Sequence, residues 1–247
     1  MKTNKNRLDQ LLVELGHAQN RERAQALILT GDVLVDDVPV IKPGTAISSE
    51  AKIRLRKTDH PYVSRGALKL VGALETFPIL VEGRIAMDVG ASTGGFTEVL
   101  LLRGAIRVHA VDVGHNQLAW KIRNDPRVQV YEKTNARSLD PSLIGDKIDL
   151  FVMDVSFISV AKILPSLLAY GRPTSDWVVL VKPQFEVGRE KVGKGGIVRE
   201  ESYRQEAIQT VTAAAQGLGL VRHGLVDSPI EGTDGNREYL AWFKPGI

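Results

Sequence analysis

The sequence contains no cysteine among its 247 residues. This absence excludes a disulfide scaffold, a thiolate nucleophile and any metal centre with cysteine ligands, and it is compatible with a reducing compartment. Long apolar runs are also missing: the most apolar tract, residues 150–170, is interrupted by Asp154, Lys162 and Pro165, so no segment has the roughly 18 apolar residues of a spanning helix. No apolar stretch of signal-peptide length follows the basic N-terminus. These absences predict a cytoplasmic protein that does not enter a membrane.

A strong charge of either sign is absent too. Thirty-two Lys and Arg residues face 29 Asp and Glu residues, for a net charge of +3, so a nucleic-acid partner would have to be bound by local basic patches. The five histidines, at positions 17, 60, 109, 115 and 223, form no metal-ligand pattern, and we predict no metal. What the chain does have is 43% hydrophobic residues, which is enough to build a substantial core.

The first sixty residues have a pattern of their own. Leucines at helical spacing over residues 8–15 predict a short helix that ends at Gly16, and Asn20 is placed to cap a second helix that ends at Gly31. Short extended pieces follow at residues 33–40 and 52–56. Residues 57–63 lack periodicity and contain His60-Pro61, which is typical of a linker. We therefore predict two domains, residues 1–60 and 61–247.

The order R-L-D-x-x-L, N-R-x-x-A-x-x-L-I-x-x-G-x-V-x-V-D and V-x-K-P resembles the small α+β RNA-binding fold shared by a small-subunit ribosomal protein and several pseudouridine synthases, the S-four-like module. The resemblance implies that the second helix of this segment and its basic residues lie on the phosphates of structured RNA, contacts that give affinity with little sequence information. The basic residues that it assigns to RNA are Arg7, Arg21 and Arg23.

From residue 64 onward, a helical pattern to about Thr76 precedes alternating apolar strands and helices. The strands are expected at residues 85–89, 108–113, 128–131, 150–154, 177–181 and 239–243. Such alternation is typical of a largely parallel α/β sheet with helices on both faces.

A glycine-rich turn, residues 88–95, joins the first of these strands to a helix. Glycines at such a turn let the backbone pass close to a ligand. The spacing is neither that of a phosphate-binding ATPase loop nor Gly-x-Gly-x-x-Gly, which weakens a dinucleotide interpretation. Asp88, ahead of the glycines, suits a cationic sulfonium, and Asp112 is placed to bind the hydroxyls of a ribose. A tight turn without a ligand and a nicotinamide-dependent enzyme remain alternatives.

The turn together with Asp112 resembles the S-adenosylmethionine site of class I methyltransferases, whose fold is Rossmann-like with a mostly parallel seven-stranded sheet. The resemblance implies that the turn surrounds the methionine end, that Asp112 binds the ribose, and that Asn135 and Ala136 lie beside the adenine, although Asn135 is equally well placed to cap a turn. The implied cofactor-binding residues are Asp88, Gly90, Ala91, Ser92, Thr93, Gly94, Gly95, Asp112, Asn135, Ala136 and Asp154.

Four further charged residues, Lys69, Asp154, Lys182 and Glu238, are expected at the same edge of the sheet. Each has a structural explanation when taken alone, such as a helix cap or a strand end. Together they match the Lys-Asp-Lys-Glu tetrad of FtsJ-like ribose methyltransferases. With Ser-Arg-Gly, Asp-Val-Ser-Phe-Ile-Ser and Val-Lys-Pro-Gln-Phe-Glu, the chain resembles the TlyA, or haemolysin A, family. This resemblance implies an S-adenosylmethionine-dependent methyltransferase that acts on cytidine 2′-hydroxyls of ribosomal RNA and has ribosomal subunits as partners.

The chemistry explains these residue types independently. A ribose hydroxyl is a weak nucleophile that must lose its proton as it attacks, so a positioned base is needed. We expect Lys182 to be that base. A neighbouring cation favours a neutral amine, which gives Lys69 a role beside Lys182, while Asp154 and Glu238 orient the two lysines and the hydroxyl.

Other residues carry weaker expectations. Residues 187–196 are rich in glycine and cations and predict an RNA clamp through Arg189 and Lys191, with a plain surface loop as the alternative. Arg65 is a further candidate for phosphate. Aromatic side chains at 157, 185 and 239 are candidates for stacking on a flipped base, although core packing is the commoner role.

Two other functions compete with the enzyme. A non-catalytic ribosome-assembly factor would retain the RNA-binding module and lose the tetrad. A membrane-active haemolysin is disfavoured because no amphipathic or spanning apolar element is found. The chain ends a few residues after its last predicted strand, which in this family favours large-subunit rRNA, with small-subunit rRNA as a second target. The sequence does not indicate an oligomeric state.

Overall fold

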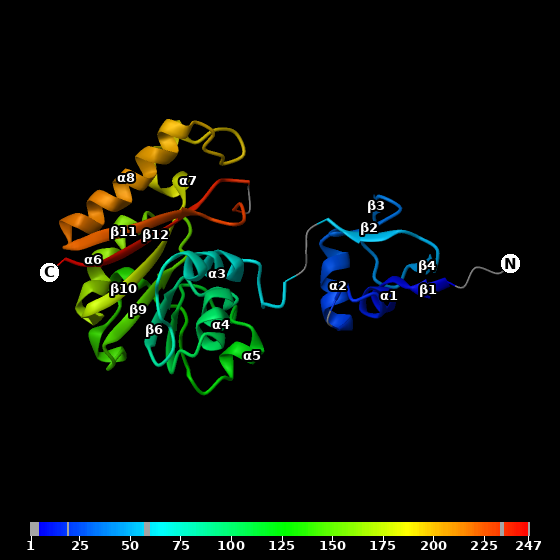
Figure 1. Ribbon diagram of the computed structural model, residues 1–247, viewed down its shortest axis with the longest axis horizontal. Coiled ribbons are helices and arrows are strands. Elements are labelled where there is room, and N and C mark those ends of the chain that lie inside the picture. The colour runs from blue at the N-terminus through cyan, green and yellow to red at the C-terminus, as the bar shows by residue number, and fades with distance from the viewer. Residues whose placement is uncertain (1–4, 19, 57–59, 233–234, 247) are drawn as a thin grey trace. The chain divides into compact units, whose positions relative to one another are not determined.

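The computed structural model of the chain describes residues 5–18, 20–56, 60–232 and 235–246. It contains two compact units, Met1–Pro61 and Tyr62–Ile247 (Figure 1). Each unit has a hydrophobic core of its own, as independently folding domains do. Residues 57–59 of the predicted linker lie outside the described residues.

The described part of the first unit contains two helices, α1 (Leu8–Glu14) and α2 (Arg21–Leu29), that pack against each other. Its short strands are β1 (Lys5–Arg7), β2 (Val33–Val35), β3 (Val38–Pro39), β4 (Ala46–Ser48) and β5 (Ile53–Leu55). Strand β1 pairs with β4, and β2 lies between β3 and β5, all antiparallel.

Local sequence signals explain these helices. The Asn20 side chain accepts a hydrogen bond from the Arg23 backbone N–H at 2.8 Å and so caps α2 as predicted. One face of α2, with Leu27 and Ile28, is buried in the core of the unit. The predicted stripe of α1 is shorter than expected, because Leu15 is 56% exposed.

The second unit alternates strands and helices. Its described elements are α3 (Ala67–Thr76), β6 (Ile85–Val89), α4 (Gly95–Leu102), β7 (Arg107–Val111), α5 (Trp120–Arg123), β8 (Val128–Tyr131), β9 (Ile148–Met153), α6 (Leu164–Leu167), β10 (Gly171–Val181), α7 (Pro183–Glu186), α8 (Glu201–Gly217), β11 (Leu220–Asp227) and β12 (Tyr239–Pro245), with short 3-10 turns η1 (Ala136–Ser138), η2 (Pro141–Leu143), η3 (Val160–Lys162), η4 (Leu168–Tyr170) and η5 (Arg189–Lys191).

One seven-stranded sheet organises this unit, in the order β11-β12-β10-β9-β6-β7-β8. The five strands from β10 to β8 are parallel. Strand β12 is inserted antiparallel between β10 and β11. The predicted α/β fold with a mostly parallel seven-stranded sheet is therefore confirmed, although the pattern of β11 was not recognised as a strand in the sequence.

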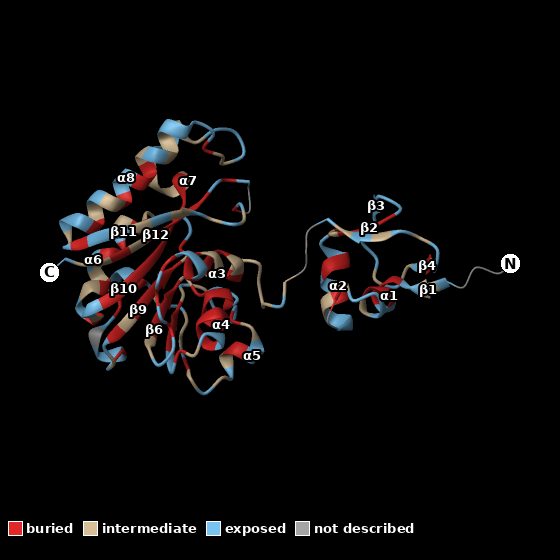
Figure 2. Ribbon diagram, in the orientation of Figure 1, coloured by how far each residue is buried: buried red, intermediate tan, exposed pale blue. Residues whose placement is uncertain are grey.

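Helices cover both faces of this sheet, and the buried residues lie along its strands and the inner faces of its helices (Figure 2). Helices α6 and α8 pack on one face, and α3, α4 and α5 pack on the other. Helix α3 begins at Ala67 rather than at Ser64, because residues 65–66 form a turn. Its inward stripe contains Ala67, Leu70 and Leu74.

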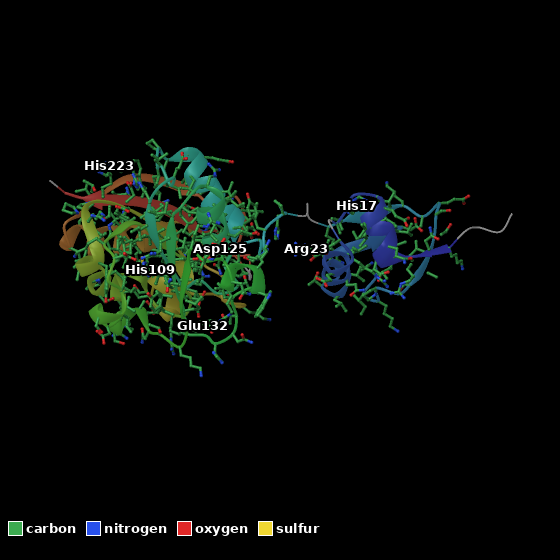
Figure 3. All side chains as sticks on the ribbon, turned by 90° about the horizontal axis from the view of Figure 1, so that it is seen from below. His17, Arg23, His109, Asp125, Glu132 and His223 are labelled. Atoms are coloured by element: carbon green, nitrogen blue, oxygen red, sulfur yellow. The ribbon has the colours of Figure 1, made fainter. Side chains whose placement is uncertain are left out.

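Within the described residues, no helix is long and apolar enough to cross a membrane. That same part of the chain holds no group of three or more His, Asp or Glu residues arranged to bind a metal ion. The histidines that Figure 3 labels lie on different elements: His17 follows α1, His109 is on β7 and His223 is on β11. His109 instead contacts the Tyr131 hydroxyl at 3.1 Å and Asp146 at 3.0 Å.

Candidate active site

Four charged side chains meet at one edge of the seven-stranded sheet. Asp154 directly follows β9 and Lys182 directly follows β10, and these parallel strands end at the same edge. Glu238 directly precedes β12, which runs antiparallel to β10 and therefore starts at that edge. Lys69 extends to the group from α3. The topology thus brings together residues that lie far apart in the sequence.

The four side chains form a row in which acids and amines alternate. Lys69 Nζ donates to Glu238 Oε2 at 2.5 Å and lies 3.8 Å from Asp154 Oδ2. The other oxygen of Asp154, Oδ1, is 2.6 Å from Lys182 Nζ. Lys182 also donates to the Ser156 hydroxyl at 2.8 Å. Ser156 has no role in the sequence-based prediction, although it lies within the Asp-Val-Ser-Phe-Ile-Ser motif.

This row is buried yet electrically balanced. Lys69, Lys182 and Glu238 are 7%, 8% and 4% exposed. Burying an unpaired charge is costly, whereas paired and hydrogen-bonded charges are tolerated. Two amines and two carboxylates cancel formally, and each is held by an oppositely charged neighbour. The arrangement therefore supplies preorganised groups that can take up a proton or stabilise a developing negative charge.

Two cavities meet at Asp154. The larger, of about 470 Å³, runs along the glycine turn and is lined by Gly90, Asp112 and Asn135 among others. The smaller, of about 250 Å³, contains both lysines of the row. Gly90, Ser92, Asp154 and Ser156 line both. The molecule therefore offers one compartment of the size usual for a small-molecule ligand and a second compartment with the reactive groups beside it.

The larger cavity has the features of a nucleoside cofactor site. Asp112 accepts from the backbone N–H groups of Ser92 at 2.8 Å and Gly114 at 2.6 Å, which fixes its carboxylate at the cavity wall. The Asn135 side chain accepts from the Arg137 N–H at 3.0 Å, so it caps η1 and also lines the cavity. Ala136 lines the cavity too. A fixed carboxylate, a side-chain amide and a bare glycine turn on one cavity wall are compatible with a nucleoside cofactor such as S-adenosylmethionine.

Some other residues of the turn line a cavity, and others support the packing of the turn. Ala91, Thr93 and Gly95 line the smaller cavity. Gly94 lines neither cavity, and a Cβ atom added there would lie 2.9 Å from a methyl group of Leu118. It therefore supports the packing of the turn.

Asp88 also lies outside both cavities, beneath the turn. It is fully buried and accepts a hydrogen bond from the Thr97 hydroxyl at 2.6 Å, while its Oδ1 atom has no hydrogen-bond partner in the structure. Burial, reinforced by the charges of Asp154 and Asp112, raises the pKa of Asp88 to about 7. Asp88 therefore lines neither cavity in this structure, and its contact with a sulfonium stays a prediction.

Asp88→Asn should change how stability depends on pH. An ordinary aspartate has a pKa of about 3.9, so the folded protein retains the Asp88 proton up to about pH 7 while the unfolded chain has lost it. The associated stability is therefore complete below about pH 4 and lost as the pH rises through 7, at up to about 1.4 kcal/mol per pH unit. Asparagine retains an acceptor for Thr97 without this titration. In denaturant unfolding of the cofactor-free protein, the free energy of unfolding of the variant should rise relative to that of the wild type from pH 5 to 8. If the two free energies change with pH in parallel, the raised pKa of Asp88 is wrong.

The predicted RNA-binding arginines occupy different settings. In the first unit, Arg7 and Arg21 have half-exposed side chains that contact Asp9, and Arg23 contacts His60 at 3.3 Å. In the second unit, Arg65 lines the smaller cavity beside Lys69.

The segment 187–196 is held by specific contacts rather than forming a featureless loop. Lys191 is bound to Glu206 of α8 at 2.5 and 2.7 Å and lies 5.5 Å from the Tyr203 ring centroid. Near the end of the segment, Asn236 donates to the Gly196 carbonyl at 2.8 Å. Arg189, in η5, is exposed. Of the two cations predicted to bind RNA, Lys191 is thus paired with an acid of the same chain, and Arg189 is the exposed one.

The three candidate stacking aromatics behave differently. Tyr239 is buried in the core, which is the commoner role expected of such a residue. Phe157 is 92% exposed, has a φ of +66° and lines the larger cavity. The Phe185 ring lies 5.3 Å from it, centroid to centroid. A large exposed aromatic on a left-handed backbone is unusual, and it faces the compartment next to the charged row.

Comparisons with known proteins agree with this geometry. The family described as FtsJ-like methyltransferase matches residues 62–245, and the family described as S4 domain matches residues 6–53. The chain is 50% identical over 239 residues to the 16S/23S rRNA (cytidine-2'-O)-methyltransferase TlyA of Mycobacterium tuberculosis, covering 96% of this chain and 89% of that one. It is 42% identical over 238 residues to Hemolysin A of Brachyspira hyodysenteriae, covering 96% and 99%. A solved structure of a putative hemolysin from Streptococcus thermophilus superposes with a TM-score of 0.78 at 43% identity, covering 99% and 90%.

Proposed function

Because this chain belongs to the FtsJ-like methyltransferase family, we propose that it transfers a methyl group from S-adenosylmethionine to the 2′-hydroxyl of cytidine in ribosomal RNA. The observation that carries the proposal is the alternating row Glu238, Lys69, Asp154 and Lys182. Its two lysines line the smaller cavity, and Asp154 lines both this cavity and the cofactor-sized one. The substrate class follows from the curated TlyA relative, which modifies cytidines of both ribosomal subunits according to its name. Ribosomal subunits are cytoplasmic, and we expect the protein there.

The cofactor supplies an electrophilic methyl group on a sulfonium. We assign the glycine turn to its methionine end, Asp112 to its ribose and Asn135 with Ala136 to its adenine. Asp112 is held by two backbone amides, so its carboxylate does not have to reorganise when hydroxyl groups bind. Asp88 supports the turn from below.

We assign proton removal to Lys182, whose amine can accept the hydroxyl proton only in its neutral form. An ion pair with Asp154 and a hydrogen bond to Ser156 fix the position of its amine at the wall of the smaller cavity. A positioned base of this kind typically accelerates a reaction by about 10²- to 10⁴-fold. Lys69, held by Glu238, supplies the positive charge that stabilises the oxyanion as the hydroxyl loses its proton.

The first unit carries the RNA. Its S4 match and the half-exposed Arg7 and Arg21 support contact with phosphates of structured RNA. Arg65, on the wall of the smaller cavity, is placed for a phosphate next to the target nucleotide. A non-catalytic assembly factor would have no need of four mutually paired charges of which three are buried, and this observation favours the enzyme.

Phe157→Ala should impair RNA methylation without unfolding the protein. We propose that the exposed ring stacks on the target base, a contact worth about 1–3 kcal/mol in other complexes, so the KM for ribosomal RNA should rise about tenfold. Because the ring is 92% exposed, the free energy of unfolding should change by less than about 0.5 kcal/mol. Trp120→Ala, at an aromatic that is 78% exposed and lines neither cavity, is the control. An unchanged KM for Phe157→Ala would remove the stacking role.

The test of the proposed function is direct. Unmodified large and small ribosomal subunits are incubated separately with the protein and S-adenosylmethionine labelled in its methyl group, and 2′-O-methylation is mapped at single-nucleotide resolution. We expect one or a few methylated cytidines in large-subunit rRNA. Label in small-subunit rRNA would extend the substrate range, and no incorporation into either subunit by protein that binds the cofactor would overturn the proposal.

A further inference from the structure

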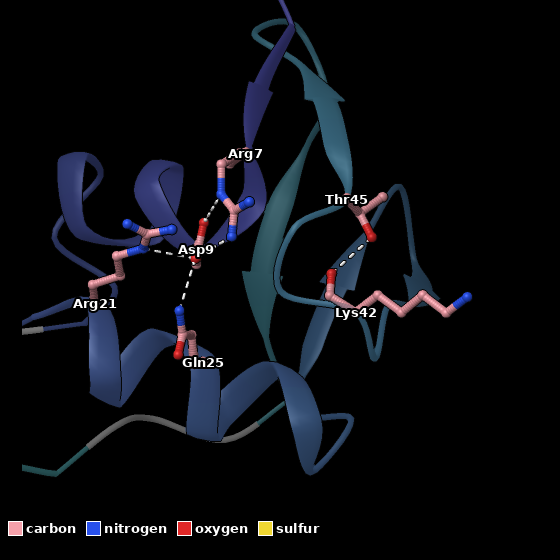
Figure 4. A network of polar contacts seen from close by, with 6 residues as sticks. All are labelled: Arg7, Asp9, Arg21, Gln25, Lys42 and Thr45. Carbon is pink, nitrogen blue, oxygen red and sulfur yellow. Dashed lines mark hydrogen bonds and ion pairs between the residues drawn. The ribbon is translucent and has the colours of Figure 1, made fainter.

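One acid of the first unit is completely buried and holds two arginines (Figure 4). Asp9, in the first turn of α1, accepts from Arg7 Nε at 3.0 Å and from Arg7 Nη2 at 2.9 Å. It also accepts from Arg21 Nε at 2.8 Å and from Gln25 Nε2 at 3.0 Å. A single carboxylate therefore ties β1 and α1 to α2.

The arginines are only partly enclosed by this contact. Their side chains are 45% and 52% exposed, whereas that of Asp9 is 0% exposed. The bonds to Asp9 do not use Nη1 of Arg7 or either terminal nitrogen of Arg21. The Arg7 guanidinium also lies close to Gly44, where an added Cβ would be 3.2 Å from Nη1 and 3.5 Å from Cζ. Each guanidinium is thus bound to Asp9 through some of its nitrogens, while about half of each side chain remains exposed.

The charges of this cluster do not cancel. Two guanidiniums share one carboxylate, so a formal charge of +1 remains on the exposed side. Hydrogen bonds from Arg7, Gln25 and Arg21 hold the pKa of Asp9 well below its usual range, so the acid stays ionised at every pH at which RNA is handled. A free arginine side chain loses about 2 kcal/mol of rotamer entropy when it is ordered, and ordering before binding lowers that cost at the moment of association.

We propose that Asp9 is a positioning residue that holds Arg7 and Arg21 as a preorganised receptor for phosphodiester groups of structured ribosomal RNA. This inference rests on the proposed function, since it takes the first unit to be the RNA-binding one. The change in RNA affinity that it predicts for loss of Asp9 is opposite in sign to the change expected from net charge alone. Removing an acid from an RNA-binding surface strengthens binding if only net charge matters, whereas removing this acid should weaken it.

The experiment measures binding of the full-length chain to unmodified large ribosomal subunits, without cofactor, at fixed salt. Asp9→Asn retains the size of the side chain but turns one acceptor into a donor facing other donors. We expect affinity to fall about tenfold, which corresponds to the loss of ordering of one to two side chains. Asp37→Asn is the matched control, because Asp37 is an exposed acid paired with Arg54 in the same unit. Its affinity should be unchanged or slightly higher.

A mutant cycle separates positioning from a general effect on the fold. If Asp9 acts through the arginines, Asp9→Asn should have no further effect on affinity in a chain that already carries Arg7→Ala and Arg21→Ala. In the otherwise wild-type chain, Asp9→Asn should raise the KM for ribosomal subunits and leave kcat at saturating subunits unchanged. Equal weakening in both backgrounds, or binding by Asp9→Asn that is as tight as wild type, would overturn the proposal.

Gly44→Ala covers the case in which Asp9→Asn does not fold. The added methyl group would lie 3.2 Å from Arg7 Nη1, so the guanidinium must shift by a few tenths of an ångström while the Asp9 carboxylate is unchanged. Weaker binding by this variant supports the proposal, and unchanged binding refutes it. Failure of the proposed function is a separate result. Wild-type protein that binds subunits but does not methylate them would refute only the catalytic assignment, and wild-type protein that does not bind subunits would refute the receptor as well.

Discussion

Lys182→Met lowers the rate of methyl transfer to ribosomal RNA by about 10²- to 10⁴-fold, the range associated with loss of a general base. Methionine has a similar length and no titratable group, so it retains much of the packing and removes the proton acceptor. The affinity for S-adenosylmethionine should stay within about twofold of wild type, because the larger cavity that we assign to the cofactor does not include Lys182 in its wall. The measurements are single-turnover methylation of unmodified subunits and a cofactor titration.

The control for this variant is Lys147→Met. Lys147 precedes β9, at the opposite end of that strand from Asp154, and its amine donates to the Ala169 carbonyl at 2.7 Å. Its replacement should leave both rate and cofactor affinity unchanged. Near-normal methyl transfer by Lys182→Met with normal cofactor binding would show that another group accepts the proton. The variant removes the ion pair of Asp154 with Lys182 and leaves its 3.8 Å contact with Lys69. Melting curves should therefore be measured with the kinetics, to detect any loss of stability.

Gly90→Ala should weaken cofactor binding by at least about 100-fold, because the substitution introduces both backbone strain and a steric overlap. Gly90 has a φ of +86°, a conformation that costs a non-glycine residue about 1–3 kcal/mol. Its Cβ would also overlap the Asp154 carbonyl oxygen and lie 2.9 Å from the carbonyl carbon. Relief of that overlap moves the backbone of Asp154, which joins the cofactor cavity to the charged row.

Gly83→Ala separates these two effects. Gly83 has a φ of +74°, and an added Cβ there meets no atom within 4 Å. The control variant should therefore lose about 1 kcal/mol of stability through its backbone alone and bind S-adenosylmethionine normally. If Gly90→Ala bound the cofactor as well as Gly83→Ala does, the assignment of the glycine turn to the cofactor would be wrong.

The charged row was predictable because of where its members stand in the sequence. Asp154 and Lys182 each end an apolar stretch, and parallel strands place their ends at a common edge. The pairing within the row was not predictable, since the sequence does not say which amine faces which acid. The orientation of Asp88 was not predictable either. Successive side chains of a strand point to opposite faces, so a shift of one residue decides whether a carboxylate near the strand end faces a cavity or the protein interior.

Two further differences have physical causes. Strand β11 escaped recognition because it is an edge strand with mostly exposed or half-buried side chains, interrupted by Gly224 and a register shift, so it lacks the alternation of a half-buried strand. Phe157 was expected in the core because aromatic residues usually are. Its left-handed backbone turns the ring outward instead, and such a conformation leaves no signal in the composition of the sequence.

The insertion of β12 between β10 and β11 has a consequence for biosynthesis. Translation proceeds from the N-terminus, and domains generally fold as units in that order, so the RNA-binding unit is complete while the chain is still being made. Glu238 directly precedes β12 and is synthesised after the other three members of the charged row. Under the proposed function, a nascent chain binds ribosomal RNA through its first unit before it is able to modify that RNA, and the charged row is complete only once β12 has joined the sheet.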